Sequence, residues 1–158
     1  MQIRDRLVLF LATGFYIGYL PGAPGTFGTL IGLPICYLIS GFQIGFSVVI
    51  TVVFIGFSVA LASGAEKNLN QKDASQIVID EIAGLLVTFV GHPFNLRTAV
   101  LGFILFRVFD ILKPIPIRWL EKKVGGGSGI VVDDVVAGIY ANLSLRLMMY
   151  IVCLGATS

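Results

Sequence analysis

The chain has 158 residues, of which 56% are hydrophobic and only 13% charged, and its mean hydropathy of +0.93 is far above soluble usage. The net charge of +2 is too small, and the basic residues are too scattered, for a nucleic-acid-binding surface. The composition therefore favours a membrane protein. At this length we expect residues 1–158 to form a single domain, an all-α, compact helical membrane bundle.

The first apolar segment, residues 7–20, follows Arg4 and Arg6 and so has the beginning of a signal peptide. Its small-residue cleavage pattern is poor, however, and further apolar segments come after it. We therefore expect a retained helix, which either crosses the membrane or lies along it.

Glycine, proline and charged residues divide the chain into apolar segments. Two of them are long enough to cross a bilayer, which takes roughly 20 residues, and two are shorter and would be tilted, re-entrant or buried among the others. The segments are 7–20, 27–40 (short), 43–63 (long), 81–95 (short), 97–112 and 134–155 (long).

Turn-like residues at 40–42 and 91–95 join neighbouring segments and predict two antiparallel hairpins. The outer ends of both hairpins then lie at one end of the bundle. Because most basic residues gather there, the positive-inside rule makes that end cytoplasmic, with Arg97 as the exception. Arg146, within the last long segment, has no explanation at this stage unless it faces the bundle or snorkels. The basic residues on the predicted cytoplasmic side are Arg4, Arg6, Lys67, Lys72, Lys113, Arg118, Lys122 and Lys123.

Five of the nine acidic residues lie at the predicted cytoplasmic ends of three different segments. Carboxylates brought together at such a place would repel one another unless a cation neutralised them. An all-oxygen ligand set without His or Cys selects a hard ion such as Mg²⁺. The predicted metal-binding residues are Asp80, Glu81, Asp110, Asp133 and Asp134.

Each acidic doublet also has a simpler explanation. Asp80-Glu81 and Asp133-Asp134 are both expected at a helix start, where a carboxylate caps free amide groups and meets the positive end of the helix dipole. One doublet alone would favour capping. Two doublets and an embedded Asp110 favour a shared site, because capping needs only one carboxylate per helix.

The stretch "FRVFDILKPIPIRW" places Arg107, Asp110 and Lys113 along one side of a helix at i, i+3 and i+6. They either form an intrahelical ion pair with snorkelling ends, or Asp110 joins the metal cluster while Arg107 and Lys113 face a substrate anion. Pro114 and Pro116 are expected to end the helix at the lysine.

Two glycine-rich stretches lie near the predicted site. "YLPGAPGTFGTL" is compatible with a backbone-lined anion site to which Thr26 and Thr29 contribute hydroxyl groups, or with a plain turn; it lacks the lysine of a Walker loop. "VGGGSGIVVDD" is either a flexible segment that passes over the same region or a plain loop.

Other catalytic chemistries lack the residues that they require. The only histidine, His92, falls in the opposite turn, and neither Cys36 nor Cys153 has the spacing of a metal site or of a cysteine phosphatase loop. The remaining prediction is metal-assisted attack by water, with a carboxylate as general base and Lys or Arg balancing phosphate charge.

Four blocks in this order resemble the phosphatidylglycerophosphatase A family: "LPGAPGTFGT", "IVIDEIAGLL", "FRVFDILKPIPIRW" and "GGGSGIVVDDVVAGI". The resemblance implies a helical membrane enzyme that uses Mg²⁺ to convert phosphatidylglycerophosphate into phosphatidylglycerol and inorganic phosphate. It implies a bacterial inner-membrane location with the active site facing the cytoplasm.

The expected roles follow from both lines of reasoning. Glu81, Asp110 and Lys113 are the expected catalytic residues, with Glu81 as the favoured base, and Thr26, Thr29, Arg107 and Lys113 are expected to bind substrate. The competing hypothesis is an ion or divalent-cation transporter, which would place carboxylates at several depths of the membrane. The sequence fixes neither the number of metal ions nor the oligomeric state.

Overall fold

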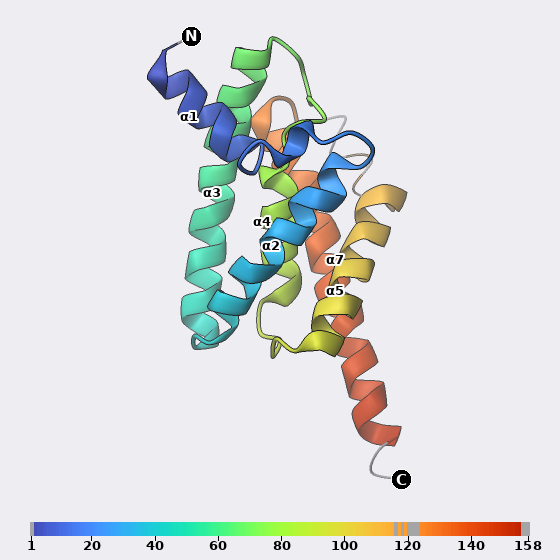
Figure 1. The fold of residues 1–158 in the computed structure, drawn as a ribbon. Coiled ribbons are helices and arrows are strands. Elements are labelled where there is room, and N and C mark those ends of the chain that lie inside the picture. The colour runs from blue at the N-terminus through green and yellow to red at the C-terminus, as the bar shows by residue number, and fades with distance from the viewer. Residues whose placement is uncertain (1, 116, 118, 120–123, 156–158) are drawn as a thin grey trace.

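The computed structural model shown in Figure 1 describes residues 2–115, 117, 119 and 124–155. Over these residues the chain is helical and contains no strand, which confirms the expected all-α class. The elements are α1 (Ile3–Ala12), the short 3₁₀ helix η1 (Ile17–Tyr19), α2 (Pro24–Ser40), α3 (Ile44–Leu69), α4 (Ile79–Phe89), α5 (Leu96–Leu112) and α7 (Gly127–Gly155).

Helix α4 is the centre of the bundle, with α2 and α5 in front of it and α3 and α7 packed beside it (Figure 1). Nine of its 11 residues are buried, because apolar side chains surround the whole helix rather than one stripe. Leu85 and Phe106 are fully buried where α4 meets α5 and α7. Burial of one such side chain contributes about 1.5–3 kcal/mol to stability, so this contact fixes the position of α4.

The two long segments form the two longest helices. Ile44–Leu69 and Gly127–Cys153 have the length and the hydropathy of membrane-spanning helices, as predicted. Much of their apolar surface points outward: Val52, Val53 and Ile151, for example, are exposed. Helices α2 and α4, with 17 and 11 residues, are shorter than a bilayer span.

Both predicted hairpins are present. Residues 41–43 connect α2 to α3, and residues 90–95 connect α4 to α5, so the outer ends of these helices meet at one end of the bundle (Figure 1). The start of α7 lies at the same end. The basic residues Arg118, Lys122 and Lys123 that supported the predicted orientation lie outside the described residues, as does Pro116.

Two predicted elements differ from the structure. Residues 7–20 do not form one helix, because α1 ends at Ala12 and the chain turns through Phe15 and Tyr16, both with positive φ, into η1.

The last helix begins at Gly127, so Asp133 and Asp134 lie in its second turn and not at its start. The capping explanation therefore fails for this doublet. Gly127 packs directly on the backbone of α3, where a Cβ would lie 2.7 Å from the carbonyl oxygen of Val59, so this close approach requires glycine.

Arg146 faces the bundle and helps to cap α4. Its Nη2 donates to the carbonyl oxygen of Val90 at 3.0 Å, and its Nε donates to Oδ1 of Asn142 at 2.8 Å. Nδ2 of Asn142 in turn donates to the carbonyl oxygens of Val87, Thr88 and Val90, at 3.1, 2.9 and 2.9 Å. The final carbonyls of α4 thus find donors on α7 instead of in solvent.

Candidate active site

A cavity of about 400 Å³ opens at the end of the bundle where the outer ends of the helices meet. It is lined by the start of α2, the connection before α4, the first turn of α4, the end of α5 and the second turn of α7. Of the nine residues predicted to form the site, eight line this cavity: Thr26, Asp80, Glu81, Arg107, Asp110, Lys113, Asp133 and Asp134.

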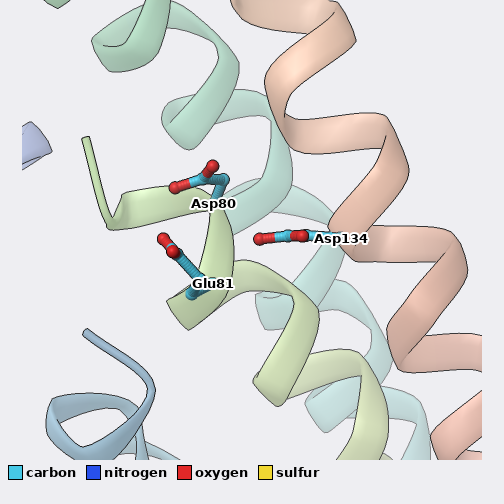
Figure 2. Close-up of side chains that lie close together, drawn as sticks. All are labelled: Asp80, Glu81 and Asp134. Atoms are coloured by element: carbon cyan, nitrogen blue, oxygen red, sulfur yellow. The ribbon is translucent and has the colours of Figure 1, made fainter. Parts of the chain in front are cut away.

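Three carboxylates converge in the cavity, and Figure 2 shows them pointing toward a common space. Asp80 and Glu81 come from the first turn of α4 and Asp134 comes from α7; one oxygen atom of each lies within 4.8 Å of the others. Adjacent helical residues normally project about 100° apart. Asp80 and Glu81 can share a site because they stand at the very start of their helix, after Val78, which has non-helical backbone angles.

Two glycines bring α4 and α7 close enough for this convergence. A Cβ on Gly84 would lie 2.6 Å from the carbonyl oxygen of Asp134, and a Cβ on Gly138 would collide with the carbonyl oxygen of Gly84. The backbones of the two helices are therefore in direct contact at this crossing. The contact places Asp134 one helical turn from Gly138 and opposite the first turn of α4.

The environment of these carboxylates opposes their negative charge. Asp80 and Asp134 are only 8% and 4% exposed. Burial, followed by the charge of Glu81, raises the pKa of Asp80 well above its usual range. Burial is also the largest cause of the raised pKa of Glu81, and the negative charge of Asp110 adds to it.

The donor set fits a hard cation. Oδ1 of Asp80 and Oε2 of Glu81 are buried and have no hydrogen-bond partner among the described residues. Buried carboxylate oxygens without partners are costly, and a bound dication would remove that cost while also neutralising the repulsion between them. An all-oxygen ligand set of this kind suits Mg²⁺.

The other two predicted carboxylates each pair with a cationic side chain. Nη1 of Arg107 lies 2.7 Å from Oδ2 of Asp110, one turn along α5, and Nζ of Lys113 lies 2.7 Å from Oδ2 of Asp133 on α7. The intrahelical ion pair weighed from the sequence is thus present between Arg107 and Asp110. The end of α5 at Leu112 is also as predicted, with Lys113 in a left-handed conformation.

The predicted anion-binding loop is the first turn of α2. Pro24 is the first residue of that helix, and a Cβ on Gly25 would collide with Oε1 of Glu81 and lie 3.1 Å from Nη1 of Arg107. Thr26 lines the cavity, whereas Thr29 is fully buried and its hydroxyl donates to the carbonyl oxygen of Gly25 at 2.7 Å. The position of Thr29 does not support the expected contact with substrate. Its neighbour is Arg107, whose Nη1 lies 3.5 Å from the hydroxyl oxygen.

Two residues that line the cavity, Asp73 and Ser75, were missed by the sequence reasoning. Asp73 has a positive φ of 46°, and its backbone N–H donates to Oε1 of Glu66 at 2.9 Å. Asp73 lies in the connection between α3 and α4, which is not helical, so residue spacing could not predict that it lines the site. The available signal was topological, since the chain must return here from α3 to the start of α4.

Comparisons with known proteins agree on one family. The family model described as phosphatidylglycerophosphatase A matches residues 10–149. The chain is 37% identical over 130 residues to the phosphatidylglycerophosphatase A of Escherichia coli (strain K12), covering 82% of this chain and 76% of that protein. It is 34% identical over 142 residues to the Haemophilus influenzae protein of the same name, covering 89% of this chain and 87% of that protein.

A third relative carries a different name. A Bacteroides thetaiotaomicron protein named "Putative phosphatidylinositol-3-phosphatase" is 30% identical over 159 residues, covering 96% of this chain and 99% of that protein. No solved structure matches the chain significantly. All three relatives are thus named as phosphatases of a phospholipid.

Proposed function

Because this chain belongs to the phosphatidylglycerophosphatase A family and is a lipid phosphatase, we propose that it removes the terminal phosphate of phosphatidylglycerophosphate. The products are phosphatidylglycerol and inorganic phosphate. The observation that carries this proposal is the single cavity in which three carboxylates lie beside two cationic side chains. Such a cavity has the groups for both a metal ion and a phosphate monoester.

The transporter hypothesis is not supported. The relatives are named as enzymes, and the carboxylates of the cavity gather at one end of the bundle instead of following a path between its two ends.

In this proposal Asp80, Glu81 and Asp134 would hold Mg²⁺. When bound there, the ion would polarise the phosphoryl oxygens and make water more acidic. The orphaned oxygens of Asp80 and Glu81 support this assignment.

The chain's own residues then bind and orient the phosphate. Arg107 and Lys113 balance its negative charge, and Thr26 in the first turn of α2 offers a hydroxyl group. Glu81, in the first turn of α4 and at the wall of the cavity, accepts a proton from the attacking water. The new bond joins the water oxygen to phosphorus, and the bond from phosphorus to the lipid oxygen breaks. The lipid oxygen takes up the proton that Glu81 received from the water and leaves as the neutral alcohol.

The membrane setting belongs to the same proposal. Two helices have the length and hydropathy of membrane spans, and large apolar side chains cover the outer face of α3, including Val48, Val49, Val52 and Val53. We place the bundle in a bacterial inner membrane as a multi-pass protein with the cavity facing the cytoplasm. The acyl chains can then stay in the bilayer while the headgroup reaches the cavity.

Phosphate release from phosphatidylglycerophosphate by the purified, detergent-solubilised protein tests the proposal. We expect turnover with Mg²⁺ and its loss in EDTA. Phosphatidylinositol 3-phosphate should be tested in parallel, because the name of one relative refers to that lipid. Absence of phosphate release from either lipid under every metal condition would contradict the proposal.

Asp110→Asn provides the matched variant, since it removes one charge from the cavity without changing the size of the side chain. We expect it to remove most of the turnover while the helical content, measured by circular dichroism, stays unchanged. Near-normal turnover would show that Asp110 has no part in the mechanism.

A further inference from the structure

The five carboxylates of the cavity fall into two groups with different partners. Asp80, Glu81 and Asp134 face one another, whereas Asp110 and Asp133 each have one oxygen 2.7 Å from a cationic nitrogen. We propose that only the first three carboxylates hold the metal ion, and that Asp110 and Asp133 are positioning residues which hold Arg107 and Lys113 toward the substrate phosphate. This inference rests on the proposed phosphatase function.

Arg107 is anchored on one side of its guanidinium group. Its Nη1 lies against both Asp110 and the hydroxyl group of Thr29, and Thr29 is itself tied to the backbone of α2. Its Nε is buried and has no acceptor among the described residues. A buried donor without an acceptor is costly, and a phosphate oxygen is a suitable acceptor. The guanidinium is therefore held in place by Asp110 and Thr29 at the wall of the cavity.

Lys113 is held across the cavity in a different way. It terminates α5 with a φ of 42°, and its ammonium group meets Asp133 on α7. The side chain of Asp133 is 9% exposed, so the pair lies largely out of bulk water. The contact uses Oδ2, and Oδ1 of Asp133 is buried without a hydrogen-bond partner among the described residues. A metal ion on Oδ1 would stand close to the ammonium group of Lys113, and the repulsion between the two cations opposes such binding.

The charges of the cavity are consistent with this division. The pairs Arg107–Asp110 and Lys113–Asp133 are each neutral, so the uncompensated negative charge is concentrated on the three converging carboxylates. A dication would bind preferentially to these three carboxylates. A phosphate would bind to the metal ion and to the side chains of Arg107 and Lys113.

Calorimetric titration of the detergent-solubilised protein with Mg²⁺ alone tests the division without relying on turnover. We expect Asp80→Asn and Asp134→Asn to weaken Mg²⁺ binding by about tenfold or more, and Asp110→Asn and Asp133→Asn to change it by less than about threefold. Asparagine keeps the size of each side chain, so the four variants are matched. A loss of Mg²⁺ affinity in Asp110→Asn or Asp133→Asn as large as that in Asp80→Asn would overturn the inference.

Phosphate binding provides the second measurement. In Asp110→Asn and Asp133→Asn, the inhibition constant of inorganic phosphate and the KM for the lipid should rise by about tenfold, because the cations lose their fixed positions. A double-variant cycle of Lys113→Met with Asp133→Asn should be clearly non-additive in KM. Additive effects would overturn the pairing.

The two hypotheses fail in different ways. If the unmodified protein releases no phosphate from either lipid, the proposed function fails, and the Mg²⁺ titration of the four variants still tests which carboxylates bind the ion. If it releases phosphate but all four variants lose Mg²⁺ affinity equally, only the division of the carboxylates fails.

Discussion

At the scale of single residues, Asp80 combines a position in the proposed metal site with an environment that opposes its charge. It is buried, it faces Glu81 and Asp134, and its pKa is raised. A group whose pKa is raised on folding contributes stability at low pH and loses it as the pH rises through that raised pKa. In the absence of metal, therefore, this residue destabilises the fold near neutral pH.

Replacing Asp80 by Asn should make the metal-free protein more stable by about 1 kcal/mol or more, because the change removes a buried charge without removing volume. Turnover should fall by at least about a hundredfold. Thermal unfolding at pH 7.5 in EDTA, with and without added Mg²⁺, measures the first effect. A variant that is less stable than the unmodified protein in EDTA would contradict this account of the site.

His92 should make stability depend on pH at the opposite end of the bundle. It is buried, its Nε2 lies 3.3 Å from the carbonyl oxygen of Asn142, and burial followed by the charge of Arg146 lowers its pKa below the ordinary 6.5. A lowered histidine pKa contributes stability above pH 6.5 that is lost as the pH falls toward the folded-state value.

The expected result is that His92→Asn reduces the change in Tm between pH 7.5 and pH 5.5. Carboxylates also titrate in acid, so the comparison is between the slopes of the two proteins and not between absolute values. Equal slopes would show that His92 carries no proton-linked stability.

At the scale of helices, the close crossing of α4 and α7 brings Asp134 next to the carboxylates of α4. Gly138→Ala should force the two backbones apart, because the added Cβ meets the carbonyl oxygen of Gly84. We expect a loss of about 1–3 kcal/mol of stability and a larger loss of Mg²⁺ affinity, since Asp134 would move away from α4. Gly56→Ala in α3 is the matched control, because a Cβ there meets nothing within 4 Å. Equal effects of the two substitutions on Mg²⁺ affinity would argue against the role of the crossing.

The cap at the end of α4 is a second test at this scale. Asn142→Leu would remove the side-chain donor to the carbonyl oxygens of Val87 and Thr88, of which Val87 keeps the backbone N–H of Val90, at an expected cost of about 1–3 kcal/mol. Leu143→Ala, on the exposed side of the same helix turn, should cost much less. Chemical denaturation of both variants in the same detergent makes the comparison.

Much of this helix arrangement follows from the sequence, and the reasons differ along the chain. The turns at 40–42 and 91–95 are marked by glycine or proline between apolar segments, so the hairpins and the meeting of the acidic ends were predictable. Residues 125–129 were misleading, because their glycines resemble a loop. The chain is nevertheless helical from Gly127 onward, and the glycine at that position serves close packing on α3.

The spacing of residues in the sequence could not predict every ion pair within the site. Helical periodicity placed Arg107, Asp110 and Lys113 on one side of α5, and the Arg107–Asp110 contact followed from it. Lys113, however, takes its partner from α7, because a left-handed residue at the helix end redirects its side chain. The role of Arg146 likewise depends on carbonyl groups of another helix, which no sequence pattern shows.

At the scale of the whole molecule, the two ends of the bundle should face opposite sides of the membrane. Cys36 is buried and Cys153 is exposed, so Cys153→Ser gives a background in which added cysteines can be labelled. A cysteine introduced by Phe42→Cys should react with an impermeant maleimide in intact spheroplasts, whereas one introduced by Lys72→Cys should react only after lysis. The reverse pattern would contradict the proposed orientation.

The shortness of α4 has a consequence for the depth at which a lipid would be dephosphorylated. Its 11 residues extend about 16 Å, whereas the 26 residues of the adjacent α3 extend about 39 Å. The start of α3 and the end of α4 lie at a similar level, at the end of the bundle with the two hairpin turns. The first turn of α4 therefore lies well below the far end of α3 (Figure 1). In the proposed membrane setting a headgroup would have to reach below the tip of α3 to meet the first turn of α4, so we expect turnover to depend on the thickness of the surrounding bilayer.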